Sequence, residues 1–138
     1  MADSAQGPTG GVTPYLSIRD QRGAEAADWY VRAFGGQELD RKPAEDGVRL
    51  IHCHLRINGA SVMLSDQFPE YTGDVVSGPP EGVTLHLQTG DPDAVWNQAV
   101  AAGAQVTMPL AEQFWGDRYG QLRAPFGHRW SIGGPSRG

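Results

Sequence analysis

A chain of 138 residues with 39% hydrophobic and 20% charged residues is long enough to bury a core and has the composition of an ordinary globular domain. Its net charge of −5 disfavours nucleic acid as a partner, and its single cysteine, Cys53, excludes an internal disulfide. The N-terminal stretch "MADSAQGPTGG" has no apolar leader region, and no run of residues reaches membrane-spanning length. We therefore expect a cytoplasmic protein that binds neither nucleic acid nor membranes.

Two similar halves follow a predicted flexible N-terminal arm over residues 1–11. The stretch "VTPYLSIRD" at 12–20 recurs as "VTLHLQTGD" at 83–91, and each copy precedes a helical pattern. The two helices are predicted to end at Gly35 and Gly103, because glycine is a common C-cap residue. We predict a first module over 12–66, a connecting loop over 67–82, a second module over 83–133 and a tail over 134–138.

Each half is predicted to form a strand, a helix and three further strands. Asp20 and Asp91 precede the helices and are predicted to cap them, while Asn58-Gly59 indicates a two-residue hairpin. The fold class is therefore α+β, with two paired βαβββ modules that form a cup-shaped mixed sheet around a pocket. The predicted strands span residues 12–18, 37–42, 48–57, 60–65, 83–89, 104–109, 117–124 and 128–133.

The strands alternate between an apolar and a mixed face, as the period of two requires. The apolar face, which includes Leu16, Ile51, Cys53 and Val83, is expected to pack under the helices. The opposite face carries hydroxyl, imidazole, amide and aromatic groups, a mixture typical of a cavity wall.

Three further segments of the chain carry predictions. Helical spacing places Trp29, Tyr30, Phe34 and Trp96 in the core, whereas His128 lies in a turn and is expected to be exposed. The segment 66–82 is rich in Pro and Gly. It either covers the pocket, with Phe68 and Tyr71 as contacts, or is a solvated connection between modules.

Taken together, the stretches "VTPYLSIRD", "WYVRAFGG", "VTLHLQTGDPDAV", "AAGA" and "QFWGDRYGQLRAPFGHRWSI" resemble the vicinal oxygen chelate superfamily. That superfamily includes glyoxalase I, extradiol dioxygenases and bleomycin-type resistance proteins, and the resemblance is greatest to its PhnB-like branch. The resemblance covers residues 12–133 and implies the paired-module fold.

The resemblance also implies where a metal would be held in the metal-using members. The four ligand positions correspond to Thr13, Met63, Thr84 and Ser131, none of which is His, Asp or Glu. Neutral hydroxyls and a thioether are poor ligands for a divalent metal, so we predict no metal and no cofactor.

Three histidines of the mixed face leave two alternatives open. His52, His54 and His86 could form a non-standard metal site, or His86 or His54 could act as a general base. Alternatively, all three hydrogen-bond to neighbouring polar groups and shape a pocket. No catalytic residue is assigned.

Three functions are weighed from these residues, with an aromatic small molecule as the expected partner. The first is a metal-free protein that binds an aromatic or polycyclic compound such as an antibiotic and thereby sequesters it. The alternative is a glyoxalase-like or dioxygenase-like enzyme that uses a non-standard histidine site, and a weaker third reading is a scaffold that only dimerises. Open strand edges predict a homodimer. The predicted ligand-binding residues are Tyr15, His52, His54, Met63, His86, Gln88, Trp115, Tyr119, Gln121 and Arg123.

Overall fold

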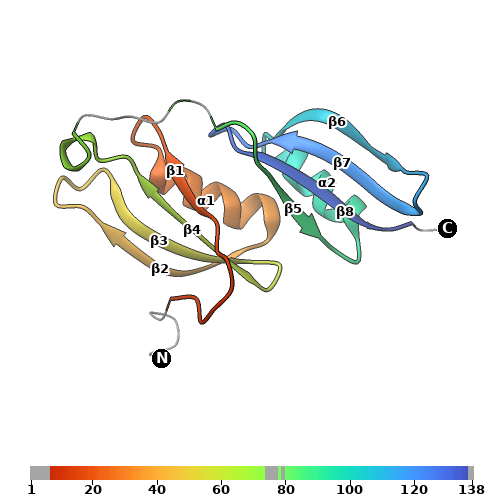
Figure 1. The fold of residues 1–138 in the computed structure, drawn as a ribbon, viewed down its shortest axis with the longest axis horizontal. Helices are drawn as coiled ribbons and strands as arrows, with labels where there is room; N and C mark the ends of the chain where they lie inside the picture. Colours follow the sequence, from red (N-terminus) through yellow and green to blue (C-terminus); the bar gives the residue numbers. More distant parts are fainter. Residues whose placement is uncertain (1–6, 74–77, 79, 137–138) are drawn as a thin grey trace. The chain divides into compact units, whose positions relative to one another are not determined.

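The structure is a computed structural model that describes residues 7–73, 78 and 80–136. The chain forms two compact units, Met1–Val31 with Gly35–Gly78 and Arg32–Phe34 with Pro79–Gly138. In each unit a helix lies along one side of a sheet (Figure 1). The elements are β1 (Tyr15–Ile18), α1 (Gly23–Phe34), β2 (Gln37–Pro43), β3 (Leu50–Ile57), β4 (Ala60–Asp66), the 3₁₀ helix η2 (Pro69–Tyr71), β5 (Thr84–Gln88), α2 (Pro92–Ala101), β6 (Gln105–Glu112), β7 (Asp117–Arg123) and β8 (Arg129–Pro135).

Each unit contains one four-stranded mixed sheet. The strand orders are β1-β4-β3-β2 and β5-β8-β7-β6. The β1–β4 and β5–β8 pairs are parallel, and the remaining pairs are antiparallel. The predicted α+β class with two βαβββ modules is confirmed. No helix in the described part of the chain is long and apolar enough to span a membrane.

One face of each sheet is buried, as the alternation predicts. Leu16, Ile18, Cys53 and Leu87 are all at most 6% exposed. The helix residues predicted for the core, Trp29, Tyr30, Phe34 and Trp96, are also buried. Trp96 packs closely on β7, where a Cβ on Gly120 would lie 2.7 Å from its ring.

The helix ends follow the predicted signals in three of four cases. Gly35 caps α1 with a φ of 67°, and α2 ends just before Gly103, whose φ is 108°. The Asp91 carboxylate caps α2 by accepting a hydrogen bond from the Ala94 amide at 3.2 Å. Asp20 does not cap α1, so that prediction is wrong: its φ is 62°, and the N-cap position is Arg22, which makes no side-chain cap bond.

A buried carboxylate from β4 serves the start of α1 instead. Asp66 is 2% exposed and accepts hydrogen bonds from the Gly23 amide at 2.8 Å and the Leu50 amide at 2.7 Å. A Cβ on Gly23 would clash with this carboxylate at 2.3 Å, so the close approach requires glycine. Asp66 therefore ties together α1, β3 and β4.

Two strand positions depart from the predicted alternation. Leu50 is 3% exposed and Ile51 is 53% exposed, the reverse of the predicted order. The register between β2 and β3 shifts between Lys42 and Pro43, opposite this end of β3, and such a shift changes which side chain faces the core. Val83 is 65% exposed because β5 begins one residue later.

His128 is the third departure from prediction. It is 8% exposed rather than solvent-exposed, and its neighbours Ala124 and Phe126 are buried as well. The turn between β7 and β8 therefore folds into the core instead of projecting from it.

The first part of the connecting segment packs locally in the first unit. Phe68 and Tyr71 stack with ring centroids 5.9 Å apart, and the Arg49 guanidinium lies 4.3 Å from the centre of the Phe68 ring. Arg49 also donates to the Glu70 carboxylate at 2.7 Å. Within the rest of the predicted pocket cover, residues 74–77 and 79 lie outside the described residues.

Replacing Asp66 with Asn tests the buried carboxylate. Asn offers one acceptor oxygen where two amide donors now converge, so its NH₂ group would face an N–H group. We expect Asp66→Asn to lower the free energy of unfolding by about 1–3 kcal/mol, measured by urea denaturation. Asp20→Asn is the matched control and should change it by less than about 0.5 kcal/mol. Equal effects of the two substitutions would contradict this assignment.

Candidate functional site

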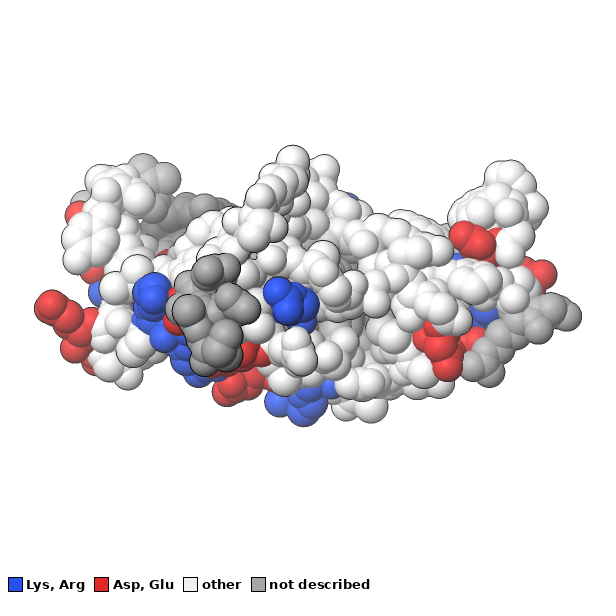
Figure 2. All heavy atoms as spheres, turned by 90° about the horizontal axis from the view of Figure 1, so that it is seen from below, with Lys and Arg blue, Asp and Glu red and all other residues white. Residues whose placement is uncertain are grey.

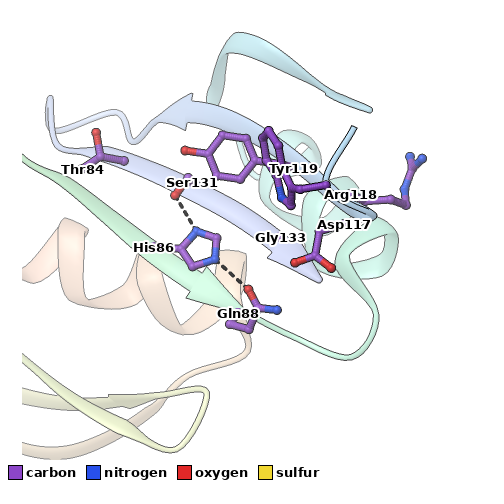
Figure 3. Close-up of a pocket in the computed structure, with 9 residues that line it drawn as sticks. Thr84, His86, Gln88, Asp117, Arg118, Tyr119, Ser131 and Gly133 are labelled. Carbon is purple, nitrogen blue, oxygen red and sulfur yellow. Dashed lines mark hydrogen bonds between the residues drawn. The ribbon is translucent and has the colours of Figure 1, made fainter. Parts of the chain in front are cut away.

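A pocket of about 400 Å³ lies on the mixed face of the second sheet. It is bordered by residues of β5, β7 and β8 and by Trp115 in the loop before β7. Figure 3 shows Arg118 running away from His86, and its guanidinium donates to Asp93 of α2 at 2.8 Å. The full lining is Thr84, His86, Gln88, Trp115, Asp117, Arg118, Tyr119, Ser131 and Gly133.

His86 lies at the centre of this pocket with both ring nitrogens engaged (Figure 3). Nε2 lies 2.8 Å from Oε1 of Gln88, and Nδ1 lies 2.7 Å from the hydroxyl of Ser131. An amide oxygen only accepts hydrogen bonds, so Nε2 carries a proton and, in the neutral ring, Nδ1 accepts from Ser131. Ser131 is 1% exposed, so its hydroxyl serves the imidazole and not the solvent.

Aromatic rings continue from His86 to the rim of the pocket. The His86 and Tyr119 rings stack with centroids 5.8 Å apart, and Trp115 meets Tyr119 edge-on at 6.1 Å. Trp115 is 53% exposed, which is high for so large an apolar side chain. This rim can stack a planar group.

The missing side chain of Gly133 leaves room for the imidazole. A Cβ there would lie 3.0 Å from Cε1 of His86 and 3.0 Å from the Arg118 carbonyl oxygen. Any larger residue at this position would push the ring from its hydrogen bonds, so the glycine is part of the site.

Gln121 and Arg123 lie in a second hollow on the same sheet. This hollow has a volume of about 190 Å³ and is lined by Thr107, Gln121, Leu122, Arg123 and Arg129. The amide of Gln121 donates to the hydroxyl of Tyr119 at 3.0 Å and so connects the two hollows. Of the predicted binding residues, the first pocket therefore gathers His86, Gln88, Trp115 and Tyr119.

The other predicted residues belong to the first unit, on the mixed face of its sheet. The hydroxyl of Tyr15 lies 2.7 Å from Nδ1 of His52, and Nε2 of His54 lies 2.8 Å from the hydroxyl of Ser61. Met63 is half-buried and pairs in register with Tyr15 and His54. Burial is the main reason that the pKa of the Tyr15 phenol is raised, which favours its neutral form.

The residues present do not fit the metal that the fold family implies. Among the described residues no three His, Cys, Asp or Glu side chains are grouped closely enough to hold an ion. Each imidazole of the mixed faces instead contacts a hydroxyl group, on Tyr15, Ser61 or Ser131. Cys53 is buried, and burial raises the pKa of its thiol to about 12, so it is not a thiolate ligand or nucleophile near neutral pH.

Sequence reasoning missed several residues that line the two hollows, among them three of β8. Ser131 was considered only as a metal-ligand position, and Gly133 and Arg129 were not considered as site residues. The alternation of β8 was the available signal, because Arg129, Ser131 and Gly133 are two residues apart and therefore share one face.

Two βαβββ modules, each with a four-stranded mixed sheet, define the fold class of this protein. The profile described as "Glyoxalase/Bleomycin resistance protein/Dioxygenase superfamily" matches residues 13–132. The chain belongs to this superfamily.

The chain is also similar to curated relatives and to solved structures. The chain is 46% identical to the uncharacterized protein Mb0911c of Mycobacterium bovis over 130 residues, which span 91% of this chain and 84% of that protein. TioX from Micromonospora sp. ML1 is 28% identical with a TM-score of 0.67, and the match covers 91% of this chain and 100% of TioX. The PhnB protein from Bacillus cereus is 19% identical with a TM-score of 0.70, covers 91% and 99% of the two chains, and shows the shared fold alone.

Proposed function

We propose that this protein is a metal-free member of its superfamily that binds an aromatic or polycyclic small molecule, such as an antibiotic, and sequesters it. The observation that carries the proposal is the His86 pocket, in which an aromatic rim adjoins a polar floor. A stacked aromatic pair contributes about 0.5–1.5 kcal/mol beyond buried area, and a hydrogen bond contributes about 1 kcal/mol net. Several such contacts are sufficient for an affinity of roughly micromolar.

The engagement of His86 favours binding over catalysis. A general base needs a ring nitrogen within hydrogen-bond reach of its substrate. Here Gln88 and Ser131 occupy both nitrogens, and the serine is too buried to serve as a nucleophile. The imidazole therefore offers a ligand its ring surface more readily than a lone pair.

The enzyme hypothesis rests on the same histidine. A ligand that displaced Gln88 from Nε2 would give His86 a substrate contact, as acid–base chemistry requires. This hypothesis predicts turnover of methylglyoxal–glutathione adducts or of catechols, whereas the sequestration hypothesis predicts binding without turnover. We also propose that the protein belongs to the PhnB-like branch, and this assignment is compatible with both the sequestration and the enzyme hypothesis.

Truncating Trp115 tests the aromatic rim. We expect Trp115→Ala to weaken binding of an aromatic ligand, selected from a panel that includes antibiotics, by at least about tenfold, or roughly 1.4 kcal/mol. Isothermal titration calorimetry measures this without relying on the tryptophan as reporter. Phe114→Ala is the comparison variant. Phe114 is 96% exposed and does not line the pocket, although its ring meets Trp115 edge-on at 5.0 Å, so its removal should weaken binding much less. Metal-dependent turnover with no binding that depends on Trp115 would favour the enzyme.

Metal analysis provides an independent test. Because Thr13, Met63, Thr84 and Ser131 are poor ligands, purified protein should carry no stoichiometric divalent metal, and EDTA should leave its melting temperature unchanged. Elemental analysis that finds close to one Zn, Ni, Mn or Fe per chain would overturn the metal-free proposal.

We also propose that the protein is a homodimer. Each sheet has outer strands that pair on one side only within their own unit, and such strands favour association. Exposed apolar side chains near them, Tyr15 and Val83 among them, support the same conclusion. Light scattering should give twice the chain mass. A monomer mass at high protein concentration would count against it.

A further inference from the structure

Two arginines face each other directly across neighbouring strands of the second sheet. Arg123 of β7 and Arg129 of β8 are register partners, and both line the hollow of about 190 Å³. Like charges in directly opposed positions destabilise an antiparallel pair. The arrangement therefore has an electrostatic cost that the strand pairing alone does not explain.

The chain neutralises this pair only in part. Arg129 donates to the Glu81 carboxylate at 3.0 Å, but the two side chains are 43% and 68% exposed, and such a surface ion pair contributes little. The hydrogen bond found for Arg123 is to the Gly127 carbonyl oxygen at 2.7 Å, a neutral acceptor. Among the described residues no carboxylate forms an ion pair with Arg123.

The arginine pair adjoins the aromatic pocket on the same face. Thr84, which lines the pocket, pairs in register with Arg129, and Gln121 connects the hollow to Tyr119. Arg123 and Tyr119 are four residues apart along β7, which is about 13 Å of strand. A long arginine side chain covers part of that distance, so one elongated ligand can reach both.

The charge along this face has a direction. Asp117 lines the pocket at the far end of β7 from Arg123. An anionic group is repelled by Asp117 and attracted at the arginine end. Arg118, which lines the same pocket, is already paired with Asp93 at 2.8 Å, so the arrangement favours one orientation of the ligand. On the face drawn in Figure 2, blue and red groups lie close together towards both ends, and blue groups in the middle lie mainly among uncharged residues.

We propose that Arg123 and Arg129 form an anion-binding subsite, and that the ligand is an aromatic compound carrying a carboxylate or phosphate. The guanidinium groups bind the anionic oxygens, Thr84 and Gln121 border them, and the aromatic part lies towards Tyr119 and Trp115. This proposal rests on the proposed function of the pocket. An arriving anion exchanges the weak Glu81 contact for charge-assisted hydrogen bonds to two arginines.

Matched probes test the charge requirement. Biphenyl-4-carboxylate should bind at least about tenfold more tightly than biphenyl-4-carboxamide, and its affinity should fall as NaCl is raised. Biphenyl-4-yl phosphate distinguishes phosphate from carboxylate as the preferred anion. Arg123→Gln and Arg129→Gln should each weaken the carboxylate by about tenfold and leave the carboxamide unchanged. Arg56→Gln is the control, since it removes one positive charge from the first unit and should have no effect.

The outcomes separate this proposal from the proposed function. Equal affinity for carboxylate and carboxamide would overturn the anion-binding subsite and leave aromatic binding intact. The same holds if Arg56→Gln loses as much affinity for the carboxylate as the Arg123 and Arg129 variants do. If neither probe binds, biphenyl compounds are excluded as ligands, the ligand panel tests the aromatic pocket, and inorganic phosphate tests the subsite alone. Phosphate should raise the melting temperature of the wild type and not that of the Arg123→Gln/Arg129→Gln double variant. No difference between these two proteins would overturn the subsite.

Discussion

Each four-stranded sheet has one helix, which covers one of its faces and leaves the other face available for the site. Within each unit a helix packs on one sheet face, and the strand period of two sends alternate side chains to the other face. Polar groups on that face must find partners or pay the cost of partial burial. The pairs Tyr15–His52, His54–Ser61 and His86–Ser131 satisfy this requirement in the same way, by joining an imidazole to a hydroxyl.

These pairs explain why the three histidines of the mixed faces do not form a cluster of metal ligands in the described part of the chain. A metal ligand needs a nitrogen lone pair directed at a shared point, with other ligands directed at the same point. His54 is 2% exposed and turns Nε2 to Ser61, while His86 is held between Gln88 and Ser131. Each ring is oriented by its own neighbours, so the histidines shape surfaces and are not assembled around an ion.

The features that depended on local pattern could be predicted from the sequence. The buried alternation at Leu16 and Cys53, the αL cap at Gly35 and the Asp91 cap all arise from residues near one another in the chain. Asp66 could not be found in this way, because its partner Gly23 is 43 residues distant and is brought to it by the fold. Ile51 was misplaced because its exposure depends on a register shift in the facing strand.

The candidate site could likewise be predicted only where it depends on local sequence pattern. Strand periodicity predicted that His86 and Gln88 share the mixed face, and the aromatic and polar composition of the segment around Tyr119 predicted a ligand contact there. Their grouping required the pairing register, which sets His86 beside Ser131 and Arg123 beside Arg129. The sequence contains the residues of the site, but the register decides which of them meet.

The internal repeat shows how one backbone supports two different faces. Tyr15 pairs with Met63 in the first sheet where His86 pairs with Ser131 in the second, at equivalent places in the strand order. A phenol with a thioether and an imidazole with a hydroxyl make surfaces of different polarity and hydrogen-bonding capacity. The strand geometry requires only that these side chains face away from the helix, so it does not constrain their chemistry. The two modules thus share a scaffold while their mixed faces differ, and the second face combines an aromatic rim with two arginines at one end.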